Sequence, residues 1–180
     1  MTFDDVVAAR RSVRSYDAAK KVTKQQVFDL IKCAQQAPSW KNSQTGRYYA
    51  VFSPDKLAEV RQCLAEQNKI VTKDVNVLLV TTYVKNRSGF TREGTPENEL
   101  GNGWGCYDLG LQNALLVLKA TEIGLDSVIL GLRDGEALRK VLNIPETEDV
   151  GAVIALGYRA NADIVAPKRK EVDDILTLFE

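Results

Sequence analysis

The sequence predicts a single α/β or α+β domain, and three observations support that class. The chain has 180 residues with 44% hydrophobic content, which is enough for one core of ordinary domain size. Segments with helical periodicity alternate with short apolar runs that are typical of strands. No internal repeat and no low-complexity linker divides the chain, so residues 1–180 are expected to fold as one domain.

Capping boxes indicate the first two helices. Thr2 followed by Asp5 is an acidic variant of this motif and opens a short helix just before the arginines of residues 10–14. Thr23 with Gln26 is a better capping box, and the helix that it opens has an apolar face that continues until Pro38 ends it.

The middle of the chain contains two predicted strands and a third helix. Residues 48–52 are aromatic or small and apolar, which favours a strand. Ser53 and Pro54 suit the cap and the first turn of the helix that follows. Residues 77–82 are a continuous apolar run, typical of a central strand buried on both faces. Residues 85–105 are polar and glycine-rich, and a loop of this length is usually functional or mobile.

The second half of the chain adds one long helix and several shorter elements. Residues 106–123 are apolar on nearly all sides and predict a buried helix, with Gly124 as its stop. The remaining elements are strands at 126–130 and 150–156, a helix at 136–142 between them, and a hydrophobic end at 173–179 that we expect to form a final strand or arm.

Charge and cysteine usage exclude several classes of protein. Lys plus Arg and Asp plus Glu both number 24, so no overall basic field attracts nucleic acid or an anionic membrane. The first residues carry no basic and apolar leader, and no apolar run reaches about 18 residues, so a cytoplasmic location is expected. The 3 cysteines form no C-x-x-C pair and are interpreted as reduced thiols.

The chain contains no histidine. This excludes catalysis by Ser–His or Cys–His pairs and metal sites made of imidazoles, and no metal ion is expected. If the protein is an enzyme, a bound cofactor is expected to carry the chemistry.

Two basic clusters lie near opposite ends of the sequence. Residues 10–16 include three arginines and Ser12, and residues 168–170 read Lys-Arg-Lys. Arginine suits bidentate recognition of phosphate, and Ser12 adds a short donor. A fold that brings the termini together would place both clusters on one phosphate. The alternative is two solvated basic patches.

Two loops and one glycine are further candidates. In residues 38–44, Asn and Gln side chains match the edge of a pyrimidine-like heterocycle, and Trp40 could stack on a ligand or fill a groove. A solvated turn is the alternative. Residues 101–105 are glycine-rich but follow polar sequence, so we expect a flexible hinge there rather than a dinucleotide-binding loop. Gly131 follows an apolar strand, where the end of the strand alone would account for a glycine; the alternative is that it lets a planar ligand approach the backbone.

In this order, these segments resemble the motifs of the FMN-dependent nitroreductase superfamily. The resemblance is carried by residues 10–16, 37–44, 124–131 and 167–170 and spans almost the whole chain. It implies an α+β fold with a central, mainly antiparallel sheet flanked by helices, in an intertwined homodimer with FMN sites at the interface. It also implies an oxidoreductase that uses NADH or NADPH to reduce nitroaromatic or quinone-type acceptors by ping-pong hydride transfer through the flavin.

The resemblance assigns roles to individual residues by their positions. Arg14 would face the pyrimidine side of the flavin and tune it. No side chain is expected to be catalytic, because flavin N5 carries the hydride. Asn68 would contact the ring, and Leu130 and Gly131 would lie along its other face. The phosphate would be held by Arg10, Ser12 and Arg169 with Lys168 or Lys170, and the residues approaching from the partner chain would be Pro38, Ser39, Trp40 and Asn42.

The sequence departs from the family pattern in two places. Thr45 and Gly46 stand where the family commonly has Pro-Trp, and Trp40 replaces a usually small residue. We expect these changes to bear on the substrate pocket and not on flavin binding. Another flavoenzyme activity on the same fold, such as a dehydrogenase or dehalogenase, is an alternative. A non-enzymatic flavin-binding protein or a small anion-binding module is another.

Overall fold

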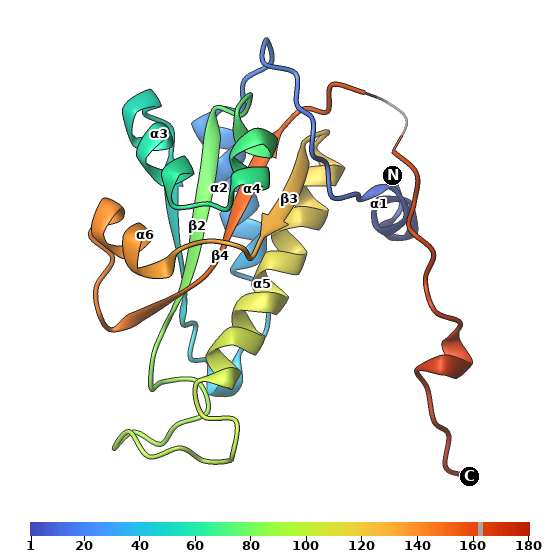
Figure 1. Ribbon diagram of the computed structural model, residues 1–180. Coiled ribbons are helices and arrows are strands. Elements are labelled where there is room, and N and C mark those ends of the chain that lie inside the picture. The colour runs from blue at the N-terminus through green and yellow to red at the C-terminus, as the bar shows by residue number, and fades with distance from the viewer. Residues whose placement is uncertain (162–163) are drawn as a thin grey trace.

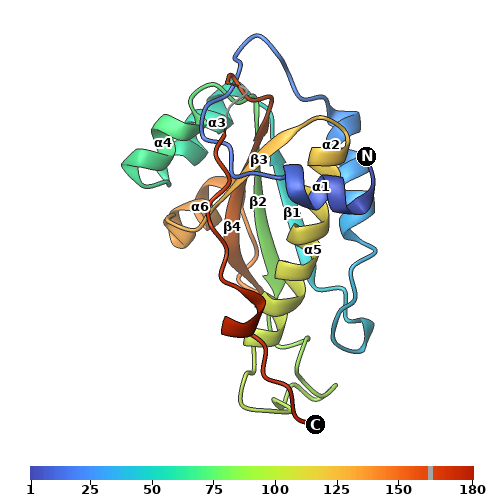
Figure 2. The ribbon, with the colours of Figure 1, turned by 90° about the vertical axis from the view of Figure 1, so that its right-hand side faces the viewer.

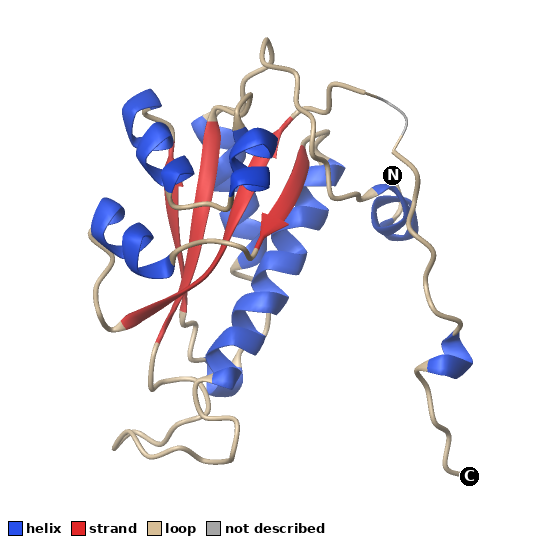
Figure 3. Cartoon of the chain, in the orientation of Figure 1, coloured by secondary structure: helices blue, strands red, loops and turns tan. Residues whose placement is uncertain are grey.

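A computed structural model describes residues 1–161 and 164–180 (Figure 1). Strands lie at the centre with helices on both sides, as Figure 3 shows. In chain order the elements are α1 (Phe3–Ala9), α2 (Lys24–Ala34), a 3₁₀ turn (Trp40–Asn42), β1 (Gly46–Val51), α3 (Pro54–Gln62), α4 (Glu66–Thr72), β2 (Val77–Val84), α5 (Gly103–Glu122), β3 (Asp126–Leu130), α6 (Gly135–Leu142), β4 (Glu148–Gly157) and a second 3₁₀ turn (Val172–Asp174).

The strands form an antiparallel sheet in the order β1-β2-β4-β3. β2 lies between β1 and β4, and its pairing with β4 runs from Val77 opposite Leu156 to Val84 opposite Glu148. Side chains along β2 are buried on both faces, so the prediction of a central strand at residues 77–82 is confirmed. The predicted α+β class with a central antiparallel sheet is confirmed as well.

Alternate residues of each central strand pack into two separate cores. On one face, Leu78 and Val80 pack with side chains of α3 and α6. On the other face, Val77 and Leu79 pack with side chains of α2 and α5. Figure 2 shows α3, α4 and α6 on one side of the sheet and α1, α2 and α5 on the other. This alternation is the expected consequence of side chains pointing to opposite faces of a strand.

The helix starts that were predicted from capping residues are confirmed. The hydroxyls of Thr2 and Thr23 accept hydrogen bonds from backbone N–H groups three residues later, and both capping boxes are complete. Ser53 caps α3 in the same way, with Pro54 in its first turn. Gly124 adopts a φ of 78°, which suits a glycine after the end of a helix.

Two sequence-based predictions about the second half are wrong. α5 begins at Gly103, so Gly103 and Gly105 belong to its first turn and not to a flexible hinge. Gly105 is buried against the ring of Tyr83, where helix and strand approach closely. α5 is also not buried all round, because Cys106 and Tyr107 are exposed in this chain.

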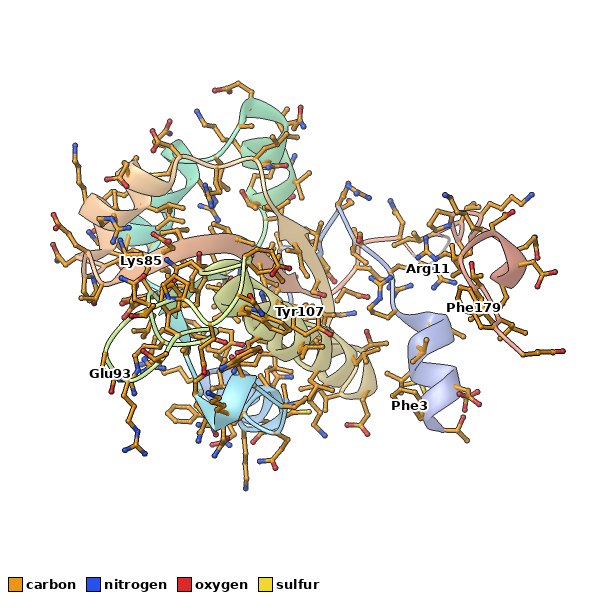
Figure 4. All side chains as sticks on the ribbon, turned by 90° about the horizontal axis from the view of Figure 1, so that it is seen from below. Phe3, Arg11, Lys85, Glu93, Tyr107 and Phe179 are labelled. Atoms are coloured by element: carbon orange, nitrogen blue, oxygen red, sulfur yellow. The ribbon has the colours of Figure 1, made fainter. Side chains whose placement is uncertain are left out.

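Both ends of the chain extend from the same side of the molecule. Figure 1 shows α1 and the C-terminal segment standing away from the sheet, and Figure 4 shows Phe3 and Phe179 on that side. The predicted final element at 173–179 forms no strand within this chain: a 3₁₀ turn is followed by extended, exposed residues. No helix in the described residues has the length and apolar character that crossing a bilayer requires.

Candidate functional site

A surface cleft of about 400 Å³ lies where the end of β3 meets α4. Four residues that were predicted to bind a cofactor, and that are far apart in the sequence, contribute to its lining: Arg14, Asn68, Leu130 and Gly131. The other lining residues are Gln67, Val71, Val128, Ile129 and Leu132.

The segment after α1 is fixed along the outer edge of β3. Ser12 forms a parallel bridge with Ser127, and the N–H of Val13 donates to the Ser127 carbonyl at 3.0 Å. Val13 and Tyr16 are buried in the core. Arg14 lies between them, is exposed, and its Nη1 donates to the Ser12 carbonyl at 3.2 Å. The buried neighbours therefore hold Arg14 at the cleft.

Asn68 is held in place by the residues that follow β3. It is 8% exposed, and its Nδ2 donates to the Leu132 carbonyl at 3.1 Å. The N–H of Ala65, just before α4, donates to the same carbonyl at 3.2 Å. These two bonds fix α4 beside Gly131, so the two walls of the cleft are joined.

The two basic clusters lie on the same side of the molecule. The N–H of Ala160 donates to the Ser15 carbonyl at 3.0 Å, so the C-terminal segment leaves β4 beside the arginine-rich segment. The C-terminal residues lie on the same side of the sheet edge as α1 (Figure 1). Lys168, Arg169 and Lys170 are exposed, and the hydrogen bonds of the described residues do not join them to Arg10.

An ion pair that was not predicted from the sequence fixes the chain where it leaves β4. Nε and Nη2 of Arg159 donate to Oδ1 of Asp126 at 2.9 and 2.5 Å, and the Arg159 N–H donates to Oδ2 at 2.8 Å. Asp126 is 8% exposed. Its carboxylate raises the pKa of Arg159, so the guanidinium stays charged. The two residues are widely separated in the sequence, and nothing in it indicates the pair.

The remaining predicted site residues lie elsewhere in the chain. Pro38, Ser39, Trp40 and Asn42 belong to residues 38–44, which pack beside the start of α5 and the loop at 85–102. They do not contribute to the lining of the cleft that contains Arg14 and Asn68. In Figure 1 this segment lies toward the opposite end of α5 from α1. The structure of one chain therefore brings together only part of the predicted set.

Residues 38–44 have an unusual backbone conformation. Lys41, Asn42 and Gln44 have φ values of 47°, 54° and 49°. This left-handed region is unfavourable for residues other than glycine. Three hydrogen bonds lie within the segment: the N–H groups of Asn42 and Ser43 donate to the carbonyls of Ser39 and Trp40 at 3.0 and 2.9 Å, and the Gln44 N–H donates to the Ser39 hydroxyl at 3.1 Å.

Three residues outside the segment contact Trp40, and a fourth, Ser88, hydrogen-bonds one of the three; we call the four residues the Trp40 clamp: Ser88, Glu97, Trp104 and Asp108. Oδ2 of Asp108 accepts from the Trp40 N–H at 3.0 Å, and Oε2 of Glu97 accepts from the indole N–H at 3.2 Å. The rings of Trp40 and Trp104 are 4.5 Å apart between centroids. The one signal in the sequence was a carboxylate, Asp108, directly between Tyr107 and Leu109.

The lining of the cleft limits the chemistry that it can perform alone. Arg14 is the one ionisable group among the described lining residues, and Gln67 and Asn68 supply amides. Such a lining can bind an anionic or heterocyclic molecule. It contributes neither a general base nor a nucleophile, so a reaction at this place needs a bound cofactor.

Several curated proteins are similar in sequence. The chain is 24% identical to the Bacillus subtilis protein YodC, provisionally named an NAD(P)H nitroreductase, over 85% of this chain and 87% of that protein. It is 22% identical to DrgA of Synechocystis over 86% of this chain and 83% of that protein. A shorter match, 29% identical, covers 47% of this chain and 40% of Bacillus subtilis YdgI, also provisionally named an NAD(P)H nitroreductase.

Solved structures and a family model agree with these matches. A structure from Exiguobacterium sibiricum, solved in complex with FMN, superimposes with a TM-score of 0.87 at 19% identity and covers 99% of this chain and 97% of that one. A nitroreductase family protein from Streptococcus pneumoniae gives 0.82 at 21% identity, over 98% and 99%. At these identities the likeness shows the fold. The model of the nitroreductase family matches residues 7–158, and the chain therefore belongs to the nitroreductase family.

Proposed function

We propose that the protein is an FMN-dependent oxidoreductase that takes electrons from NADH or NADPH and passes them to flat, electron-poor acceptors such as nitroaromatics or quinones. The observation that carries this proposal is the convergence of Arg14, Asn68, Leu130 and Gly131 on one cleft. Family membership and the provisional names of YodC and YdgI support the activity.

The residues present fit an FMN molecule. Arg14 and Asn68 offer a cation and an amide to the polar edge of a heterocycle, and Leu130 offers an apolar surface. A Cβ placed on Gly131 would meet no atom within 4 Å, so the backbone there is open to a flat ring. The phosphate would be held by Arg10, Ser12 and Arg169 with Lys168 or Lys170. When bound, FMN supplies hydride transfer at its N5.

The proposed enzyme is a homodimer of single-domain chains with both protomers at each flavin. Within one chain, residues 38–42 lie away from the cleft that holds Arg14. In a dimer, Pro38, Ser39, Trp40 and Asn42 would reach the partner's cofactor and exclude water from one side of it. The cytoplasmic location expected from the sequence belongs to the same proposal.

The purified protein tests this directly. We expect yellow protein that retains FMN, and rapid bleaching of the flavin when NADH or NADPH is added without oxygen. Addition of a nitroaromatic or a quinone should restore the colour. A colourless chain that takes up no FMN in a titration would refute the proposal. Flavin that binds but is not bleached would favour a non-enzymatic flavin-binding protein, and bleaching without reoxidation by either acceptor would favour another activity on the same fold.

A further inference from the structure

We propose that Asp108 and Glu97 are positioning residues for the flavin site, which hold residues 38–44 in one fixed conformation for contact with the partner's cofactor. The inference rests on the proposed function, because it concerns FMN bound between two protomers. It assigns a task to the loop at 85–102: together with α5, this loop supplies the Trp40 clamp.

A single oxygen of Asp108 joins three segments of the chain. Asp108 lies on α5 and is 2% exposed. Its Oδ2 accepts from the Trp40 N–H at 3.0 Å and from the Ser88 hydroxyl at 2.5 Å. Trp40 belongs to residues 38–44, and Ser88 to the loop at 85–102. Burial of a carboxylate is unfavourable unless hydrogen bonds compensate for its lost hydration. The presence of a buried carboxylate here therefore indicates that the position of Trp40 matters.

Glu97 makes a second attachment from the same loop. Its Oε2 accepts from the Trp40 indole N–H at 3.2 Å, and Lys41 Nζ donates to Oε1 and Oε2 at 2.5 and 2.7 Å. The ring of Trp40 meets that of Trp104 at an angle of 53°. Trp40 is therefore held at its backbone N–H, at its indole N–H and at its ring, by three different residues.

These contacts hold a conformation that the segment would not readily keep alone. Lys41, Asn42 and Gln44 all have positive φ values. A left-handed conformation is unfavourable for a residue other than glycine. Without the clamp, residues 38–44 would relax, and FMN binding would then have to reorder them. Reordering would weaken FMN binding, whereas a segment that is already in the bound conformation avoids this loss of affinity.

The chain contains its own probe for this arrangement. Trp40 and Trp104 account for both tryptophans of the sequence, and two indoles in contact give an exciton couplet in far-ultraviolet circular dichroism. The couplet of the full-length protein without FMN reports on the contact between the two indoles independently of the cofactor. The dissociation constant of FMN, measured by flavin fluorescence, reports on the consequence for the cofactor.

The decisive variants are Asp108→Asn and Glu97→Gln, with Glu99→Gln as the control. Glu99 is an exposed acid on the same loop. We expect both clamp variants to lose amplitude in the couplet and to bind FMN about ten-fold more weakly, while Glu99→Gln behaves as wild type. The Glu97 side chain is partly solvated, so Glu97→Gln should melt at the wild-type temperature. Weaker binding there cannot be attributed to unfolding.

Wild-type couplets and wild-type FMN affinities in both variants would overturn the inference. If Asp108→Asn fails to fold, Glu97→Gln decides alone: a lost couplet with weaker FMN binding supports the inference, and unchanged affinity refutes it. A wild-type protein that binds no FMN refutes the proposed function itself and the flavin role of the clamp with it. In that case the couplet of the wild-type protein and its loss in the variants still show whether Trp40 and Trp104 are held in contact.

Discussion

The arginines of the two basic clusters differ in whether their guanidinium groups already form hydrogen bonds within the chain. Arg11 donates to the carbonyls of Ala8 and Arg10 at 2.5 and 2.8 Å, so its guanidinium is used within the chain. The exposed guanidinium of Arg169 is available for a ligand. A phosphate between the two basic clusters would therefore depend on Arg10 and Arg169 and less on Arg11.

We expect Arg10→Ala and Arg169→Ala each to weaken FMN binding by about 1.5–3 kcal/mol, the range for hydrogen bonds to charged groups. Arg11→Ala, which removes the same charge from the same cluster, should have a clearly smaller effect. Flavin fluorescence titration measures all three. Equal losses in the three variants would indicate a general charge effect and not a built phosphate site.

Glu97 predicts a dependence on pH. The hydrogen bond from Lys41 lowers the pKa of this carboxyl below its usual value, with a further contribution from the Trp40 indole. A group with a lowered folded-state pKa contributes its stabilisation at neutral pH and loses it only as the pH falls through that pKa. We therefore expect the signal of the Trp40–Trp104 pair to stay constant on acidification until below the usual range of glutamate. Glu97→Gln should remove this step, and a step of the same size in that variant would assign it to another acid.

At the scale of elements, the sequence predicted features that depend on neighbouring residues, but not contacts between segments that are far apart in the chain. The caps of α1, α2 and α3 were predicted because each depends on residues within three or four positions. The Asp126–Arg159 pair and the Trp40 clamp depend on which segments the fold brings together. The same reason explains the error at residues 101–105, where glycine marks close packing of α5 on the sheet.

Gly105 gives a test of that packing. A methyl group on this residue would collide with the ring of Tyr83, so we expect Gly105→Ala to lower the free energy of unfolding by about 1–3 kcal/mol. Gly103→Ala is the matched control, because a Cβ there would approach no atom closer than the Cβ of Leu100 at 3.5 Å, an ordinary contact. Urea denaturation of both variants provides the comparison. Equal stability of the two would mean that α5 can shift away from β2 without loss.

At the scale of the whole molecule, both ends of the chain expose large apolar side chains. Phe3 on α1 is 72% exposed, and Phe179 near the C-terminus is 95% exposed. Ile175, Leu176 and Leu178 are exposed as well. Both chain ends lie on the same side of the molecule (Figure 4), and apolar side chains exposed together on one side are characteristic of an interaction site. The proposed homodimer would cover it, and the same association would bring residues 38–42 of one chain to the cleft of the other.

Removal of residues 173–180 tests whether assembly and cofactor binding depend on each other. We expect the truncated protein to sediment as a monomer and to lose FMN, because a flavin site built from two chains cannot be completed by one. A full-length variant with Leu178→Ser and Phe179→Ser should fall between the two states, since it keeps the backbone but loses apolar area. Sedimentation velocity and the ratio of flavin to protein absorbance give both quantities on the same sample. A truncated monomer that retains FMN at low protein concentration would show that the cleft around Arg14 and Asn68 binds the cofactor without a second chain.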